Sequence, residues 1–196
     1  SVSWPAAGNE PGHVRVFEYR EISYTEFLNG NSSNYYQDTL NPEPIIIGAS
    51  SGWNTNPLHE YWIQVGKDIH SATAGGQAEY FGMSVSIDTS GNTIAAHAPF
   101  FEQGASNGNL RRGKAEIFEW NNSQWSQLGN TIYGESPEDQ AGSSSFLMYR
   151  HRTISMSYTG NRIIVGAKFN DGSGTDAGHA RIYELNNNQW GQLGSD

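Results

Sequence analysis

The sequence contains no cysteine, which excludes disulfide bonds, thiolate catalysis and cysteine-based zinc sites together. It has no apolar run near the ~20 residues of a membrane-spanning helix, and no basic segment followed by an apolar stretch opens it as a signal peptide would. We therefore expect no membrane insertion and a fold that is held together by its core alone.

Positive charge is also scarce. The 11 lysines and arginines stand against 20 aspartates and glutamates, and the net charge is −9. Nucleic acids and anionic lipids are bound by clustered basic residues, whereas the basic clusters here are short, at Arg111–Arg112 and Arg150–Arg152. We therefore predict no nucleic-acid partner.

The residues that are abundant favour a globular β protein. The chain has 196 residues, of which 36% are hydrophobic and 23 are glycine, the usual composition of a folded domain. Its central stretch, Glu79 to Gln127, holds three short runs bounded by Gly, Asn or Ser, which is typical of strands joined by turns. The runs predict strands at Met83 to Ile87, Thr93 to Ala98 and Lys114 to Trp120.

The same runs recur along the chain. Ile163 to Ala167 repeats Ile94 to Ala98, and Gly178 to Glu184 repeats Gly113 to Glu119. The motif W-x-Q-L-G occurs at Trp125 and Trp190, and a related W-x-Q-V-G occurs at Trp62. These tryptophans stand about 64 residues apart, so the chain is predicted to be a repeat protein.

The repeat boundaries divide one continuous segment, residues 1–196. A partial repeat covers approximately residues 1–19, a degenerate one residues 20–66, and two good ones residues 67–129 and 130–194. Within the degenerate repeat, residues 20–34 form a polar insertion whose place the pattern does not indicate. The chain lacks an initiating Met and begins inside a repeat, so we expect a processed or truncated product.

A unit of this length with three or four short strands is too long for a solenoid coil and suits a four-stranded propeller blade. We therefore predict an all-β fold of about three propeller-type blades, in a partial or open propeller. Propellers close with roughly 4 to 8 blades. The terminal blades are accordingly expected to be covered by further repeats of a parent chain, by a second copy or by a partner protein.

The residues at Tyr80 to Ser86, followed by Ala96 to Pro99, resemble an FG-GAP repeat, the blade motif of the integrin alpha-chain propeller. The W-x-Q-L-G variant is similar to tandem repeats in large secreted or surface proteins of marine microbes and algae. The resemblance implies a non-catalytic adhesion or binding module that is extracellular or on the cell surface. An organelle lumen, as a subunit of a larger complex, is the alternative location.

The family's calcium loop, D-x-D-x-D-G-x-x-D, has no full counterpart here. Its place is taken by Asp88 to Asn92 and Tyr158 to Asn161, which we interpret as hairpin turns because Gly and Asn tolerate positive φ. The stretch around Asp171 and Asp176 offers oxygen ligands at a spacing that calcium accepts, but we favour a solvated turn. We therefore expect no cofactor and a fold that forms without calcium.

Catalytic patterns are sparse. His13 and His179 occupy one repeat position, which Lys114 takes in the third copy, so they are interpreted as strand residues. His97 is interpreted as a buried, hydrogen-bonded core histidine. Since no nucleophile with a partnered base is visible in the spacing, the chain is predicted not to be an enzyme.

Recognition is expected on the variable connections, residues 20–34, 100–112, 143–153 and 169–177, with a protein or a glycan as the ligand. Aromatic residues beside arginine are typical interface anchors. The candidates are Phe146, Met148, Tyr149, Arg150, Arg152, Arg111 and Arg112. A cap on the blade is the alternative role for the aromatics. For the whole chain, the alternatives to a binding module are a structural subunit docked on a larger assembly and, more distantly, a glycan-active enzyme.

Overall fold

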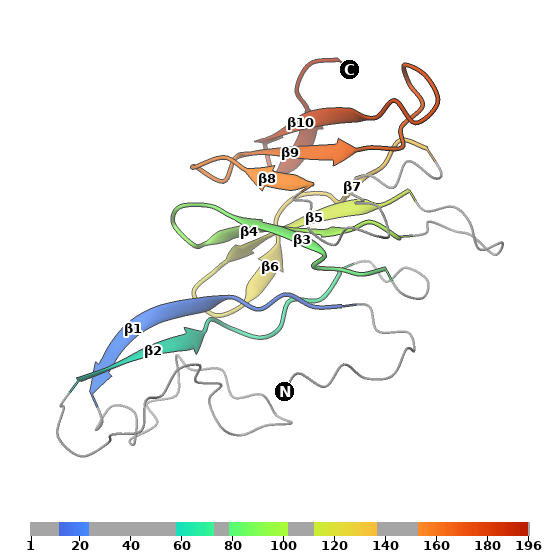
Figure 1. The fold of residues 1–196 in the computed structure, drawn as a ribbon. Coiled ribbons are helices and arrows are strands. Elements are labelled where there is room, and N and C mark those ends of the chain that lie inside the picture. Colours follow the sequence, from blue (N-terminus) through green and yellow to red (C-terminus); the bar gives the residue numbers. More distant parts are fainter. Residues whose placement is uncertain (1–11, 24–57, 73–78, 102–111, 137–152, 196) are drawn as a thin grey trace, which may run out of the picture. The chain divides into compact units, whose positions relative to one another are not determined.

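The computed structural model describes residues 12–23, 58–72, 79–101, 112–136 and 153–195, and every regular element in these ranges is a β-strand (Figure 1). The all-β prediction is therefore confirmed for the described part of the chain. These ranges contain no helix with the length and apolarity that crossing a membrane requires. The chain divides into two compact units, a larger one of residues 1–14, 70–120 and 126–196 and a smaller one of residues 15–69 and 121–125.

The smaller unit contains an antiparallel pair of strands, β1 (Phe17–Ser23) and β2 (Leu58–Gln64), in which Phe17 faces Gln64 and Ser23 faces Leu58. The strand predicted to include His13 begins only at Phe17, so the placement of His13 in a strand was wrong. The reason is the partner: β2 ends opposite Phe17, and the preceding residues have no continuous strand to pair with.

The first sheet, which apart from Trp125 belongs to the larger unit, has the strand order β3 (Ser84–Ile87), β4 (Thr93–Ala98), β5 (Lys114–Trp120) and β6 (Trp125–Gln127). A short strand, β7 (Ile132–Tyr133), pairs with the start of β5. The predicted strands are confirmed, with β4 and β5 at their predicted bounds and β3 beginning one residue later than predicted. Their alternating or continuously apolar residues, ended by Gly and Asn, explain why these segments are extended.

The second sheet of the larger unit has the order β11 (Gln189–Gln192), β10 (His179–Asn186), β9 (Arg162–Ala167) and β8 (Ile154–Met156), and all neighbours are antiparallel. His179 is the first residue of β10, as predicted for a strand residue. Both sheets of this unit thus run in sequence order from one edge to the other.

The sequence repeat is also a repeat of hydrogen-bond register. Trp62 faces Tyr19 in the first copy and Trp190 faces Leu185 in the last, at matching repeat positions. After the tryptophan strand, one backbone N–H donates to the carbonyl of the neighbouring strand at the same place in every copy. These bonds are Val65 to Val16 (2.8 Å), Leu128 to Ile117 (2.8 Å) and Leu193 to Ile182 (2.7 Å).

The hairpins β3–β4 and β8–β9, between the first two strands of each sheet of the larger unit, are turns, as predicted. Gly91 and Gly160 adopt φ values of 75° and 72°, a conformation that glycine adopts at little cost. In the first hairpin, Oδ1 of Asp88 accepts hydrogen bonds from the N–H groups of Asn92 and Thr93, both at 3.1 Å. This carboxylate closes the turn.

The two sheets of the larger unit pack face to face, and their core lies between them (Figure 1). Successive side chains point to opposite faces, so every second residue of a strand faces this core; burial alternates along β9, whereas β4 and the first part of β5 are buried on both faces. The first sheet and β7 contribute Ala95, Ala115, Ile117 and Ile132, and the second sheet contributes Ile154, Ile163, Val165 and Trp190. Each fully buried branched side chain contributes about 1.5–3 kcal/mol, so this interface stabilises the unit as a whole.

Candidate functional site

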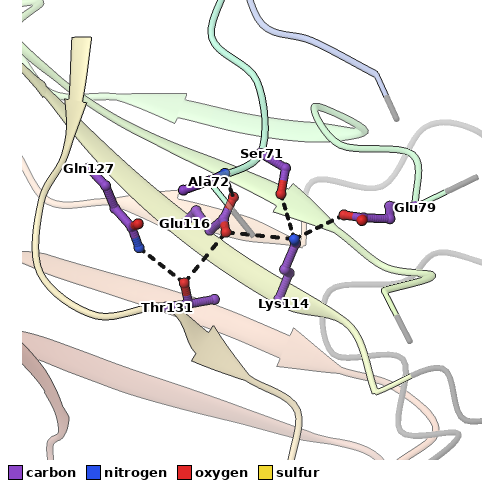
Figure 2. Close-up of polar contacts among 7 residues, drawn as sticks. All are labelled: Ser71, Ala72, Glu79, Lys114, Glu116, Gln127 and Thr131. Atoms are coloured by element: carbon purple, nitrogen blue, oxygen red, sulfur yellow. Dashed lines mark hydrogen bonds and ion pairs between the residues drawn. The ribbon is translucent and has the colours of Figure 1, made fainter. Parts of the chain in front are cut away.

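A cluster of charged side chains lies inside the larger unit. The side chains of Lys114 and Glu116 are 0% exposed and that of Glu79 is 1% exposed. Figure 2 shows the Lys114 ammonium between the two carboxylates: Nζ lies 2.9 Å from Oε2 of Glu79 and 3.6 Å from Oε1 of Glu116. The ammonium also donates to the hydroxyl of Ser71 and lies 4.0 Å from the centre of the Phe101 ring.

Strand geometry places Lys114 and Glu116 together, because residues two apart on β5 point to the same face of the sheet. Glu116 has further donors on that face. Its Oε2 accepts the N–H of Ala72 at 3.1 Å, and its Oε1 accepts the hydroxyl of Thr131 at 3.5 Å. Gln127 in turn donates to Thr131 at 3.0 Å, so a chain of polar contacts crosses the sheet (Figure 2).

An amine in contact with carboxylates is suited to proton transfer, but a catalytic group also needs contact with its substrate. The exposure of these three side chains leaves no surface for a substrate to reach. Moving an ion out of water costs several kcal/mol, which only close partners offset. The cluster therefore has a structural role: it holds the segments that carry Ser71 and Glu79 against the start of β5.

Sequence reasoning assigned no role to this cluster. A signal was available in the sequence, because Lys114 and Glu116 alternate with Ala115 and Ile117 and so share one face of the predicted strand. The repeat position of Glu116 is occupied by Arg15 and Arg181 in the other copies. Each of these arginines forms an ion pair with a different acidic residue. Arg15 donates to both carboxylate oxygens of Asp68 at 2.8 Å in the smaller unit. Arg181 pairs with Glu135 at 2.7 Å in the larger.

The predicted metal and binding residues are only partly described. Asp171 and Asp176 are exposed and lie in one turn, in which Oδ1 of Asp171 accepts the N–H of Asp176 at 2.7 Å. Within the described ranges, no three acidic or histidine residues gather as a metal site would need. Beside this turn, burial lowers the pKa of Lys168, and the Asp176 carboxylate opposes that shift.

Arg112 is held within its own sheet, since its guanidinium donates to the carbonyls of Gly134 at 3.0 Å and Glu135 at 2.9 Å. The other binding candidates lie outside the described residues. They are Phe146, Met148, Tyr149, Arg150, Arg152 and Arg111. His97 is buried, as predicted, and is 0% exposed.

The contact between the two sheets of the larger unit includes specific polar bonds. The indole N–H of Trp190 donates to the carbonyl of Leu128 at 2.9 Å. The Asn130 side chain bonds to both backbone groups of Trp190, accepting from its N–H at 2.7 Å and donating to its carbonyl at 3.3 Å. In the smaller unit, the indole of Trp125 donates to the carbonyl of Val65 at 2.7 Å, the same bond at the same repeat position.

The opposite face of the last sheet is apolar and exposed. Ile164 and Ile182 face each other across β9 and β10 and are 41% and 42% exposed, and Leu193, just after β11, is 46% exposed. Beside them, Arg162 donates to Glu184 at 2.7 Å, which lowers the pKa of that carboxylate. We call the exposed residues Ser155, Ile164, Ala180, Ile182 and Leu193 the outer face.

Comparison with known proteins adds no family assignment: no family model matches the chain, and a search of curated proteins finds no significant match. The resemblance to FG-GAP repeats stays a hypothesis that rests on the quoted residues.

Proposed function

We propose that this chain is a non-catalytic protein-binding module built from FG-GAP-like propeller blades, and that it binds its partner through the outer face of the last sheet. The proposal rests on a comparison of the same repeat positions in two sheets. Ile164 and Ile182 occupy the repeat positions of Ala95 and Ile117, which are 0% exposed because another sheet covers them. A face that is an interface in one copy is therefore open in the next.

The chemistry of the outer face suits a protein partner. Its centre is apolar, and the Arg162–Glu184 ion pair lies on the same face. An apolar centre with polar residues around it is the usual composition of a protein interface. Exposed apolar patches on soluble proteins mark interaction surfaces when they are contiguous, and Ile164 and Ile182 are direct cross-strand neighbours.

The propeller assignment is part of the proposal. Propeller blades are stacked sheets of four antiparallel strands, and the two sheets here have four strands in sequence order, with β7 as a fifth strand in the first. The repeated register and the repeated indole bond support a blade-like unit of about 64 residues. The buried charge cluster is a structural element in this proposal, because its three side chains are closed off from any ligand.

Association of the purified chain tests the proposal. Sedimentation velocity from about 1 µM to about 100 µM, which spans the range of weak protein interfaces, should show self-association that grows with concentration. The double variant Ile164→Glu/Ile182→Glu should remain monomeric, because association would bury two unpaired carboxylates.

Tyr158→Glu is the matched control, because Tyr158 is 77% exposed in the β8–β9 turn, outside the defined face, and its replacement should leave association unchanged. Tyr158→Glu should keep the parent melting temperature, since exposed substitutions change stability by about 0.5 kcal/mol or less. The double variant places two carboxylates opposite each other across β9 and β10, so it should lose about 0.2–1 kcal/mol of stability and stay folded. Self-association that survives the double variant at full strength would contradict the proposal.

A further inference from the structure

The proposed binding face has a counterpart on the preceding sheet, where the occupant is visible. There the next repeat places Trp190 against the end of the W-x-Q-L-G motif, with its indole N–H on the carbonyl of Leu128. Gly129 is required beneath the ring: it has φ 75°, and a Cβ built on it would lie 2.8 Å from Cδ1 of Trp190. Leu128 and Gly129 thus form a cradle for the tryptophan of the following repeat.

The last repeat carries the same cradle, and it is open. Leu193 is anchored as Leu128 is, by a backbone bond from its N–H to the third strand of its sheet, here at Ile182. Gly194 has φ 85°, close to the value of Gly129, but a Cβ built on it would meet nothing within 4 Å. Gly194 thus has the left-handed conformation although no ring of the described residues lies over it.

Hydroxyl groups also occur at the same repeat positions on the first strand of both sheets. Oγ of Ser84 accepts the N–H of Thr153 at 3.3 Å, and Oγ of Ser86 accepts the N–H of Met156 at 3.0 Å, so two serines of β3 receive the first strand of the next sheet. By register, Thr153 and Ser155 stand at these positions in the last sheet, and Ser155 is exposed. The edge therefore again presents hydroxyls at both positions.

We propose that the outer face binds a further sheet of the same W-x-Q-L-G type, whose tryptophan donates its indole N–H to the carbonyl of Leu193 over Gly194. This inference rests on the proposed function and names its partner. Apolar residues alone could bind many different protein surfaces. The Leu193–Gly194 cradle and the hydroxyl groups of Thr153 and Ser155 favour a sheet with a tryptophan at this one position. The partner is thus recognised by its repeat motif.

The test appends a second copy of residues 130–194 directly after Gly194 of the chain, which is how Asn130 follows Gly129. In NMR hydrogen exchange, the additional indole N–H should be protected to a similar degree as that of Trp190, slowed by at least about tenfold relative to an exposed indole. The appended copy carries Ile164→Glu and Ile182→Glu, so that its own outer face does not associate. Because it covers the outer face of the parent, the extended chain should also lose the concentration-dependent association of the parent.

Two substitutions and one control connect these readouts to the cradle. Ile182→Glu in the original copy of the extended chain should remove the additional protection, while the control Tyr158→Glu in the same copy should retain it. Gly194→Ala in the parent chain should cost only the backbone strain of its positive φ. In the extended chain the same change should cost more and should expose the additional indole, since a Cβ there would meet the ring as one would at Gly129.

The outcomes separate the inference from the proposed function. An additional indole that exchanges freely would overturn the inference. If Ile164→Glu/Ile182→Glu still abolished association of the parent, the face would bind another partner, such as a second whole copy, and the proposed function would stand. If neither the double variant nor the extension changed association, both would fail.

Discussion

Lys114 and Glu116 are charged residues in the interior of the larger unit, where a strand would ordinarily place apolar side chains. They are retained there because each charge has close partners, two carboxylates and a hydroxyl for the ammonium and additional N–H and O–H donors for Glu116. Replacing a whole buried ion cluster by apolar residues is often neutral, while removing one member is strongly destabilising.

We expect Lys114→Met to destabilise the chain by about 3–5 kcal/mol, because it leaves two buried carboxylates without their cation. Urea unfolding followed by tryptophan fluorescence measures the change. The triple variant Lys114→Met/Glu79→Gln/Glu116→Gln should recover a large part of the loss, since it removes the charges together. Lys67→Met serves as the control, because Lys67 is exposed. A Lys114→Met protein as stable as the parent would show that the cluster contributes nothing.

At the scale of the element, the tryptophan strand is the piece that joins one repeat to the next. Trp190 lies on β11, is 4% exposed, and combines a large apolar ring in the core with an indole bond to the preceding sheet. A buried tryptophan normally finds a partner for its N–H. The corresponding bond of Trp125 in the smaller unit indicates that the position is a general feature of this repeat.

Replacing Trp190 by Phe keeps most of the ring but deletes the donor, and it leaves the carbonyl of Leu128 without that bond. We expect a loss of about 1–3 kcal/mol, the usual cost of a buried group left unsatisfied. Thermal unfolding with Trp190→Phe and Trp125→Phe should show the same direction of change. Tyr158→Phe, at an exposed aromatic, should leave the midpoint unchanged. Equal midpoints for Trp190→Phe and the parent would mean that the indole bond adds no stability.

At the scale of the whole molecule, the carboxylates of the described turns are bound by backbone N–H groups. The Asp88 carboxylate is engaged by the backbone of its own hairpin, and Asp171 by the backbone of its own turn. Oxygen atoms that already accept N–H donors would have to exchange those bonds for a cation. Calcium sites usually bring six to eight oxygen ligands together, far more than either turn offers.

We therefore expect thermal unfolding of the full chain to be the same with excess calcium and with a chelator. A ligand that binds only the native state raises stability by RT ln(1 + [L]/Kd), about 2.7 kcal/mol at a hundredfold excess over Kd. Calorimetry in the two conditions should give coincident midpoints. A rise of more than a few degrees with calcium would reveal a native-state site and would disprove this expectation.

Much of the local structure was predictable from the sequence because its causes are local. Alternating apolar residues specified β4 and β5 to the residue, and Gly91 and Gly160 marked the hairpins whose positive φ they adopt. The tryptophan spacing predicted a repeat, and the repeat appears as a common register. The start of β1 at Phe17 was not predictable, since it depends on where the partner strand β2 ends.

The sequence by itself thus determined the strands β3 to β5, the two hairpin turns and the period at which the pattern recurs. Only the tertiary structure decided which charges are buried and which apolar residues are exposed. Lys114 is buried because Ser71 and Glu79, both distant in sequence, come to lie around it. Ile117 and Ile182 occupy the same repeat position, yet one is covered and the other is open. Whether a side chain is buried depends on the neighbouring sheet. The sequence pattern of a strand indicates which residues share a face, but it does not indicate whether another sheet covers that face.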